Sequence, residues 1–258
     1  SPNFPLTVRP VTSDVDHPQI TPSSPTGSAM KILAWSGPRN LSTAMMYAFG
    51  NRPDFEVMDE PFYAAYLANT GLDHPMRDAI LASQPTDPAA VATLCRKPPK
   101  IHSYQKHMAH HMLPDFPLDW TAGAVHLHLI RHPARVIASY GAKRDDISES
   151  DIAFAAQASL YDRVGGLVID TADLREDPAK MLAKLCSEVG ISFDPAMLSW
   201  SGGGHSADGI WASHWYNAAH ASTGFAGPEG PLPAVDRDDL LQAALPFYTA
   251  MKARALQV

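Results

Sequence analysis

The sequence predicts one α/β domain, built on a central parallel β-sheet with helices on both faces. From residue 30 onward, short apolar runs typical of buried strands alternate with segments of helical composition. Strands that alternate with helices imply βαβ units and a parallel sheet that helices cover on both sides. A chain of 258 residues with 45% apolar side chains has enough sequence for one such domain with a full core, rather than for two.

Five strands are expected, most of them short apolar runs that end at a glycine or a charged residue, and the third is entered from Pro98-Pro99. They cover residues 31–36, 55–58, 100–106, 125–130 and 166–170. The clearest is VHLHLI at residues 125–130.

Helices are expected between and after these strands. Their composition, caps and breakers place them at residues 40–49, 134–143, 148–164, 178–189 and 236–254. Ser148 or Ser150 is expected to cap the third helix, and Gly190 to end the fourth. The stretch after residue 61 is expected to be helical and rich in loops, because three prolines interrupt it.

Residues 1–29 are expected to form a tail or linker, which places the domain at residues 30–258. They hold six prolines among Ser, Thr and Asp residues. They have neither a charged start nor a hydrophobic run, so they do not resemble a signal peptide. Extended chain packed onto the domain stays an alternative for this segment.

Composition and charge narrow the class of protein. Lys and Arg number 20 against 27 Asp and Glu, which leaves a net charge of −7 and argues against a nucleic-acid or anionic-membrane partner. A small polyanionic ligand held by a few arginines remains compatible with this negative net charge. No segment approaches the run of about 18 apolar residues that a membrane span needs. Cys95 and Cys186 have no metal-ligand spacing, so we expect a reduced, cytoplasmic enzyme without disulfides.

Functional side chains are expected after the strands, because ligands of open parallel sheets bind beyond the carboxyl ends. The first strand runs into SGPRNLST, residues 36–43, at a helix N-terminus. Free backbone N–H groups make this an anion site, to which Ser42 and Thr43 add hydroxyls and Arg39 adds a charge. In the nucleotide P-loop, G-x-x-x-x-G-K-[ST], Ser42 and Thr43 would be Gly and Lys, which argues against an NTPase. An ordinary helix cap after a βα turn is the alternative.

A second signal follows the strand at residues 125–130. Arg131 ends that strand, Pro133 follows, and Ser139 comes eight residues after Arg131. An NTPase often has an acid here that helps to hold Mg²⁺, whereas an arginine suits a bare phosphate. Ser139 is expected about two turns into the next helix, on a face that can turn toward the same phosphate. A surface cation and a helix-packing serine are the alternative.

Together these two segments resemble the sulfotransferases that use 3′-phosphoadenosine 5′-phosphosulfate as donor. The bacterial form of that family's first loop commonly reads P-R-S-G-T-T, and residues 38–43 read PRNLST, with Asn40 and Leu41 in place of Ser-Gly. The resemblance implies that this loop holds the 5′-phosphosulfate and that Arg39 is the catalytic cation. It also implies a P-loop NTPase-like three-layer fold with a central parallel sheet.

The second segment matches the family's R-x-P-x-x-x-x-x-S pattern, in which the Arg and the Ser hold the 3′-phosphate. Residues 166–174, GLVIDTADL, are similar to the family's Y-E-D-L segment. The resemblance therefore covers the core from about residue 31 to residue 174.

The C-terminal third departs from the family's R-K-G-x-x-G cofactor loop. It offers residues 208–225, DGIWASHWYNAAHASTGF, whose Trp and Tyr rings are candidates to flank an adenine. This segment is similar to a bacterial and plant branch sometimes labelled branched-chain aminotransferase-like, although no lysine here has a recognisable pyridoxal-phosphate context. An aromatic-rich helix packed on the sheet is the alternative. The donor-binding residues that the resemblance implies are Gly37, Pro38, Arg39, Asn40, Leu41, Ser42, Thr43, Arg131, Ser139 and Trp211.

On the acceptor side, sulfuryl transfer needs cations near the moving group and a base for the acceptor. Arg39 and Lys106 are the candidate cations. Glu60, in the segment DEPF, resembles the E-P-F glutamate that serves as base in some bacterial and carbohydrate members. His107 follows a strand much as the family's catalytic His follows a K-x-H motif. The sequence leaves Glu60 and His107 open as the base.

We therefore expect a metal-independent sulfotransferase that moves a sulfuryl group from this donor to a hydroxyl or amine of a small molecule. That acceptor is the expected partner, rather than nucleic acid or a membrane, and a homodimer stays open. A small-molecule kinase or nucleotide hydrolase is an alternative that Asp170 at a strand end supports. A non-catalytic nucleotide-binding module is another. A metal site at His107, His110 and His111 is a third, although no H-E-x-x-H pattern is present.

Overall fold

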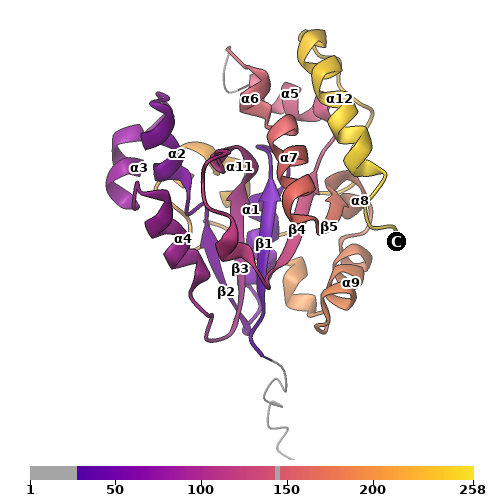
Figure 1. Cartoon of the computed structure of the whole chain (residues 1–258). Coiled ribbons are helices and arrows are strands. Elements are labelled where there is room, and N and C mark those ends of the chain that lie inside the picture. The colour runs from indigo at the N-terminus through magenta and orange to yellow at the C-terminus, as the bar shows by residue number, and fades with distance from the viewer. Residues whose placement is uncertain (1–27, 143–145) are drawn as a thin grey trace, which may run out of the picture.

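Strand β1 lies at the centre of a five-stranded parallel sheet with the order β2-β3-β1-β4-β5 (Figure 1). The structure is a computed structural model and describes residues 28–142 and 146–258. The strands are β1 Lys31–Ser36, β2 Phe55–Asp59, β3 His102–Met108, β4 Val125–Ile130 and β5 Leu167–Asp170. All five predicted strands are present, which confirms the α/β class with a parallel sheet.

The register aligns the carboxyl ends of the strands at one edge of the sheet. Ser36 of β1 pairs with Met108 of β3, and Asp59 of β2 pairs with Lys106 of β3. The chain leaves β1 toward β2 on one side and later crosses to β4 on the other. Such a reversal of strand order leaves a crevice at the carboxyl edge, where ligands of this class of fold bind.

Helices surround the sheet, with short 3₁₀ segments between some of them. The first six helices are α1 Ser42–Gly50, α2 Tyr63–Thr70, α3 Arg77–Ser83, α4 Pro88–Arg96, α5 Pro133–Gly141 and α6 Glu149–Ile152. The others are α7 Phe154–Val164, α8 Thr171–Glu176, α9 Pro178–Val189, α10 Ala212–Trp215, α11 Asn217–His220 and α12 Asp238–Lys252. The 3₁₀ segments are η1 Ala109–His111, η2 Asp119–Thr121 and η3 Pro195–Leu198.

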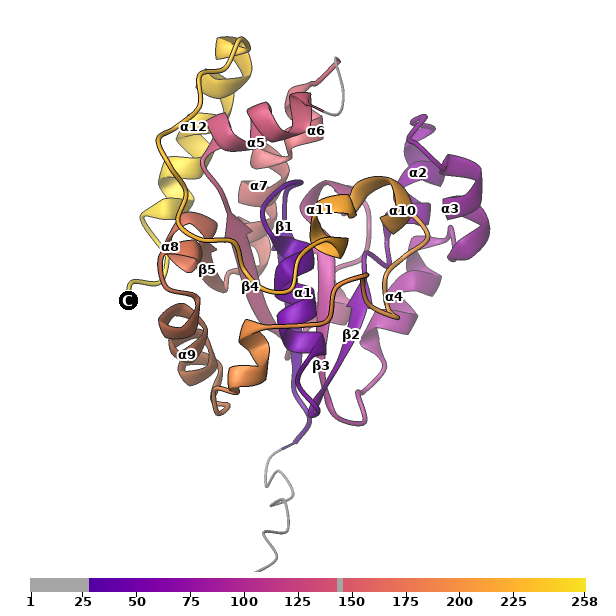
Figure 2. The ribbon, with the colours of Figure 1, turned by 180° about the vertical axis from the view of Figure 1, so that it is seen from behind.

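The two faces of the sheet carry separate core clusters, because side chains alternate along each strand. Ile32 and Ala34 of β1 pack in a cluster with α1, α8 and α9. Leu33 and Trp35 pack in a second cluster with α4 and α7. Figure 1 shows α4, α7 and α12 in front of the sheet, and Figure 2 shows α1 on the opposite face. The three-layer fold expected from the sequence is therefore confirmed.

Two helix predictions differ from the structure. The helix expected at residues 148–164 is divided into α6 and α7, because Ala153 adopts a left-handed φ of 63°. Ser148 caps α6 through a reciprocal capping box with Asp151, as one of the two expected caps. The helix expected to end near Lys143 ends at Gly141, and Lys143 lies outside the described residues, as do residues 1–27 of the expected tail.

Among the described residues, no helix is both long and apolar enough to cross a membrane. Cys95 and Cys186 are buried free thiols in the clusters on opposite faces of the sheet. They are therefore core residues, a role that the sequence analysis did not assign to them.

Candidate active site

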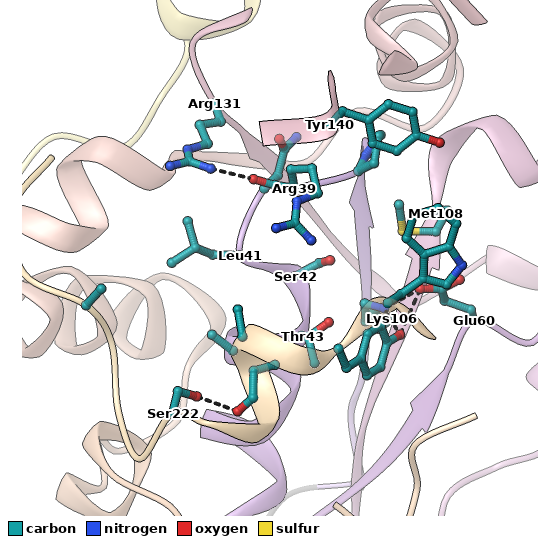
Figure 3. Close-up of a pocket in the computed structure, with 18 of the residues that line it drawn as sticks. Arg39, Leu41, Ser42, Thr43, Glu60, Lys106, Met108, Arg131, Tyr140 and Ser222 are labelled. Atoms are coloured by element: carbon teal, nitrogen blue, oxygen red, sulfur yellow. Dashed lines mark hydrogen bonds and ion pairs between the residues drawn. The ribbon is translucent and has the colours of Figure 1, made fainter. Parts of the chain in front are cut away.

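A pocket of about 660 Å³ opens at the carboxyl edge of the sheet, a volume typical of sites for small ligands. Figure 3 shows the loop after β1 running along one side of it, with Arg39 between Arg131 and the pair Glu60 and Lys106. The structure brings nine of the predicted site residues together here. They are Pro38, Arg39, Asn40, Leu41, Ser42, Thr43, Glu60, Lys106 and Arg131.

The loop after β1 leaves the start of helix α1 available to a ligand. Leu41 is the N-cap of α1, with φ 56°, and its side chain makes no capping hydrogen bond. The first backbone N–H groups of a helix have no partner within the helix, and together with the helix dipole they attract an anion. Ser42 and Thr43 add their hydroxyls at the same place. The start of α1 and these two hydroxyl residues therefore border the same pocket.

Two departures from the P-R-S-G-T-T pattern have local explanations. Leu41 stands at the Gly position and keeps the left-handed conformation that Gly adopts freely, at a cost on the order of 1–2 kcal/mol. Asn40 stands at the Ser position, is 2% exposed, and donates from Nδ2 to the carbonyl oxygen of Leu129 in β4 at 3.2 Å. The longer amide side chain thus fixes the loop to the neighbouring strand.

Hydrogen bonds fix the side chains of both Arg39 and Arg131. Arg131 donates from Nη1 to the backbone carbonyl of Arg39 at 2.9 Å, and Arg39 donates from Nε to Ser139 Oγ at 2.9 Å. Burial, followed by the proximity of Arg131, lowers the pKa of Arg39, which nevertheless stays charged at neutral pH because the ordinary value is so high. Two positive charges therefore face the same end of the pocket (Figure 3).

The opposite end holds a buried polar cluster of Asp59, Glu60, Lys106 and Tyr216. Lys106 Nζ donates to Asp59 Oδ1 at 3.0 Å, to Glu60 Oε1 and to the Tyr216 hydroxyl. The Tyr216 hydroxyl lies 2.9 Å from oxygens of both Asp59 and Glu60. One lysine thus faces two carboxylates, and the cluster has a formal charge of −1.

The environment shifts the protonation equilibria of this cluster. Burial, with Asp59 adding to it, raises the pKa of Glu60 above its ordinary value although Lys106 opposes the shift. Burial alone would lower the pKa of Lys106, but Asp59 and Glu60 together hold it above its ordinary value. Burial, with Asp59 and Glu60, also raises the pKa of Tyr216. Lys106 is therefore charged and Tyr216 neutral at pH 7, whereas Glu60 binds its proton more tightly than a free glutamate does.

The backbone at Glu60 is strained in a way that fixes its side chain. Its φ is 40°, a conformation that costs about 1–3 kcal/mol in a non-glycine residue and is found most often at functional sites. Its N–H donates to the carbonyl of Lys106 at 2.9 Å, and its carbonyl accepts from Gln84 Nε2 at 3.0 Å. Pro61, which follows, fixes its own φ and restricts the backbone of Glu60 before it.

Within the described residues, His107, His110 and His111 do not form a group that could hold a metal ion. His107 faces the apolar cluster on one side of the sheet, whereas His110 and His111 line the pocket. Burial lowers the pKa of His110 to about 4 and that of His111 well below its ordinary value. These two rings are therefore neutral at pH 7 and give the pocket polar walls without charge.

The structure corrects the prediction for His107. Its ring is 2% exposed, stacks on Trp35 at 4.6 Å between centroids, and lies 3.2 Å through Nε2 from Gln105 Oε1. Burial lowers its pKa to about 3. Lys106 and His107 are neighbours in a strand and must point to opposite faces, so the face that places Lys106 in the pocket places His107 in the core.

Three further predicted residues do not line the pocket. The N–H of Gly37 donates to Gln157 Oε1 at 3.2 Å and is not available to a donor phosphate. Trp211 is 2% exposed and donates from Nε1 to the Tyr216 hydroxyl at 3.0 Å, so its ring is a core residue that supports Tyr216. Ser139 contacts Arg39 instead of the pocket space.

Asp170, which supported the kinase alternative, also lies outside the pocket lining. It is fully buried, accepts from the Tyr248 hydroxyl at 2.6 Å, and pairs with Lys252 Nζ at 2.9 Å. Its other oxygen accepts from the N–H of Ala172 and caps α8. These contacts account for the carboxylate as a structural group that joins β5 to α8 and α12.

Arg175, Tyr216 and the residues around Ser222 also line the pocket. The sequence offered the segment 208–225 with its Trp and Tyr rings, but gave Trp211 as the donor-binding residue, and it did not single out Arg175. Arg175 directly follows the TADL segment. In each case the signal was the segment, and only the fold shows which side chain reaches the pocket.

Comparison with known proteins gives the family of this chain. A family model described as Sulfotransferase domain matches residues 30–255. Two relatives from Arabidopsis thaliana, named branched-chain-amino-acid aminotransferase-like proteins 2 and 1, are 35% and 34% identical to this chain over 231 and 234 residues. Each match covers 86% of this chain and 41% of the relative, so the chain spans less than half of the length of these relatives.

Solved structures share the fold. The sulfotransferase domain from the Synechococcus PCC 7002 olefin synthase has a TM-score of 0.50 at 22% identity, over 86% of this chain and 96% of that one. A sulfotransferase from Alicyclobacillus acidocaldarius has a TM-score of 0.51 at 13% identity, over 88% and 96% of the two chains. With the family match extending from β1 to the end of α12, this chain belongs to the sulfotransferase domain family.

Proposed function

We propose that this domain transfers a sulfuryl group from 3′-phosphoadenosine 5′-phosphosulfate to a hydroxyl or amine of a small molecule, without a metal ion. One observation carries the proposal. A single pocket joins an anion-binding helix start and two arginines to a buried carboxylate–lysine cluster, with Arg39 between them (Figure 3). This is the order in which donor, moving group and acceptor base must stand for an in-line transfer.

The residues at the donor end fit a phosphosulfate nucleotide. The N–H groups at the start of α1, with Ser42 and Thr43, are suited to the 5′-phosphosulfate. Arg131 is suited to the 3′-phosphate, and Ser139 supports Arg39 through its hydrogen bond. The donor supplies the sulfuryl group, and Arg39 is placed to neutralise the charge that develops on the bridging oxygen as that group leaves.

The residues at the other end fit an acceptor that loses a proton. Glu60 lines the pocket and has a raised pKa, so its carboxylate is suited to accept the proton of a hydroxyl or amine. Lys106 holds Glu60 in place and offsets part of its charge. Neutral His110 and His111 on the wall, together with the formal charge of −1 on the carboxylate–lysine cluster, favour an uncharged or cationic acceptor over an anionic one.

The experiment that tests this function measures binding before turnover. Adenosine 3′,5′-bisphosphate is expected to raise the melting temperature of the protein, whereas ATP with Mg²⁺ is not. A screen of hydroxyl and amine acceptors with the phosphosulfate donor then identifies the second substrate. Stabilisation by Mg-ATP alone would favour the kinase alternative, and stabilisation by neither would favour a domain without nucleotide binding.

Arg131→Ala is expected to weaken adenosine 3′,5′-bisphosphate binding by about tenfold or more, because a charge-assisted hydrogen bond contributes about 1.5–3 kcal/mol. Isothermal titration calorimetry measures the effect. Arg163→Ala, at an exposed position of α7 outside the pocket lining, is the matched control and is expected to leave the affinity unchanged. Equal affinity of a folded Arg131→Ala protein and the wild type would remove the assignment of Arg131 to the 3′-phosphate.

Sulfuryl transfer is expected to proceed at full rate in excess EDTA. The moving group carries less charge than a terminal phosphate, and Arg39 with the start of α1 supplies a positive field without a metal. The measurement is initial rate with and without chelator, at saturating donor and acceptor. A rate that EDTA abolishes and that Mg²⁺ or Zn²⁺ restores would contradict a metal-independent transfer.

A further inference from the structure

Glu229 lies in the connection between α11 and α12 and is held by three arginines from other parts of the chain. Oε1 of Glu229 accepts from Arg131 Nε at 2.8 Å and from Arg175 Nη1 at 2.9 Å. Arg135 Nε approaches Oε2 at 2.6 Å as an ion pair. The Glu229 side chain is only 3% exposed. The side chain of Glu229 is thus buried among three arginines, although the connection that carries it lies at the surface.

The arginines also hold the backbone on both sides of Glu229. Arg175 donates from Nε to the carbonyl of Gly227 at 2.7 Å, and Arg135 donates to the carbonyl of Gly230. The segment 226–231 has no helix or strand, and its residues other than Glu229 are exposed. Figure 2 shows this connection passing α8 on its way from α11 to α12. We call residues 226–231 the strap.

The carboxylate of Glu229 balances only part of the positive charge of the three arginines. Three guanidinium groups carry +3, and one carboxylate offsets only −1 of it. Oε2 of Glu229 also accepts no hydrogen bond of good geometry from the described residues, although Arg135 is close. A phosphomonoester carries nearly two negative charges near neutral pH and three terminal oxygens, so it suits three guanidinium groups better than a carboxylate does.

The arginine cluster opens into the proposed donor end of the pocket. Arg131 and Arg175 both line the pocket, and Arg131 also binds the backbone of Arg39. A ligand phosphate that reached Arg131 would therefore meet the carboxylate of Glu229 on the same guanidinium group. Two anions cannot share these donors without strong repulsion, so one must leave.

We propose that Glu229 competes with the donor for one binding site. Its carboxylate occupies a phosphomonoester site formed by Arg131, Arg135 and Arg175, which we call the seat. The 3′-phosphate of the donor displaces this carboxylate. This rests on the proposed function for the identity of the donor, whereas the seat itself rests on the arginine geometry. Displacement releases the Glu229 side chain, and the hydrogen bonds from Arg175 to Gly227 and from Arg135 to Gly230 are then the contacts that can retain the strap. Arg135 and Arg175 thereby become donor-binding residues in addition to Arg131.

Glu229→Gln tests the competition, because it removes the charge and keeps the shape of the side chain. The apparent affinity of a site that is open only part of the time is reduced by that fraction. Glu229→Gln is therefore expected to bind adenosine 3′,5′-bisphosphate about tenfold or more tightly than the wild type. Glu176→Gln, an exposed carboxylate beside Arg175 with the same change in net charge, is the control and is expected to change the affinity less than twofold. Inorganic phosphate, measured by thermal shift, probes the seat without a nucleotide and is also expected to bind Glu229→Gln more tightly.

The possible outcomes test the arginine seat and the identity of the donor separately. Equal or weaker binding of both ligands by Glu229→Gln would overturn the proposal, because Glu229 would then organise the arginines for the ligand. Tighter phosphate binding by Glu229→Gln, with bisphosphate bound by neither protein, would support the seat and contradict the donor of the proposed function.

A second measurement uses the wild-type protein and does not depend on a variant that folds. Glutamyl endopeptidase needs access to the Glu229 side chain to cleave the bond between Glu229 and Gly230. Bisphosphate is expected to accelerate this cleavage several-fold, followed by mass spectrometry, while adenosine 5′-monophosphate, which lacks the 3′-phosphate, is not. Protection of the bond by bisphosphate would overturn displacement, since Glu229 would then stay in the cluster when the ligand binds.

Discussion

Arg39→Ala is expected to lower kcat by about 10²–10³-fold, the loss typical of removing one fixed group that stabilises transition-state charge. The Kd for adenosine 3′,5′-bisphosphate is expected to change much less. Arg39 lies between the proposed donor and acceptor ends of the pocket (Figure 3). Charge builds on the bridging oxygen only as the sulfuryl group leaves, so a cation placed there contributes chiefly to the transition state. Single-turnover rates and calorimetric affinities of the same protein measure the two effects separately.

Ser139→Ala is the control that separates the position of the Arg39 guanidinium from its charge. It keeps the Arg39 guanidinium and removes the hydroxyl that accepts from its Nε at 2.9 Å. We expect a smaller loss of kcat than for Arg39→Ala, because a mispositioned cation still neutralises some charge. If Arg39→Ala raised Kd as much as it lowered kcat/KM and left kcat intact, Arg39 would be a binding residue and not a catalytic one.

The strands and their order of alternation were predictable because they depend on local pattern. Runs such as VHLHLI contain enough apolar residues to indicate a strand without tertiary information. The break at Ala153 was not predictable, because no Gly or Pro marks it and an alanine with φ 63° is held there by its surroundings. The short helix α8 was missed for a similar reason. Its cap is the side chain of Asp170, which ends a strand.

The loop proposed to bind the donor was largely predictable, since a loop between a strand and a helix is local. The residues that the sequence placed on that loop line the pocket, with the exception of Gly37. The sequence could not show that Leu41 takes the conformation of a glycine. That conformation depends on contacts from β4 and α7, such as those of Asn40 with Leu129 and of Gln157 with Gly37.

The proposed acceptor side was less predictable, because it is assembled from distant segments. A strand pattern shows that Lys106 and His107 face opposite sides, but not which side faces the pocket. The answer depends on Asp59 and Tyr216, which are far from Lys106 in sequence and surround its ammonium group. The contacts of Glu229 with its arginines are of the same kind and left no local signal.

Glu60→Gln is expected to lower kcat by two or more decades, since a positioned base contributes about 10²–10⁴-fold. Glutamine keeps the size of the side chain and a carbonyl oxygen for Lys106, whose charge Asp59 continues to balance at 3.0 Å. Affinity for adenosine 3′,5′-bisphosphate is expected to remain within a few-fold of the wild type, because Glu60 lies at the end of the pocket away from Arg131 (Figure 3). Single-turnover kinetics with saturating donor measure the loss.

The pH dependence identifies the group that accepts the proton. A base must be ionised to act, so kcat of the wild type should fall as the pH drops through the pKa of Glu60. Burial raises that pKa above the value of about 4.3 that a free glutamate shows, so the fall should begin at a correspondingly higher pH. Glu60→Gln should lack this limb of the profile.

His107→Asn is the matched comparison, because His107 was the other base that the sequence allowed. Its pKa of about 3 keeps the ring neutral throughout the range in which Glu60 titrates, so it contributes no limb there. The ring lies in the aromatic cluster with Trp35 and Trp120. The substitution should therefore lower the melting temperature while kcat of the folded protein stays within a few-fold. A loss of two decades in His107→Asn with normal bisphosphate binding, and none in Glu60→Gln, would reverse the assignment of the base.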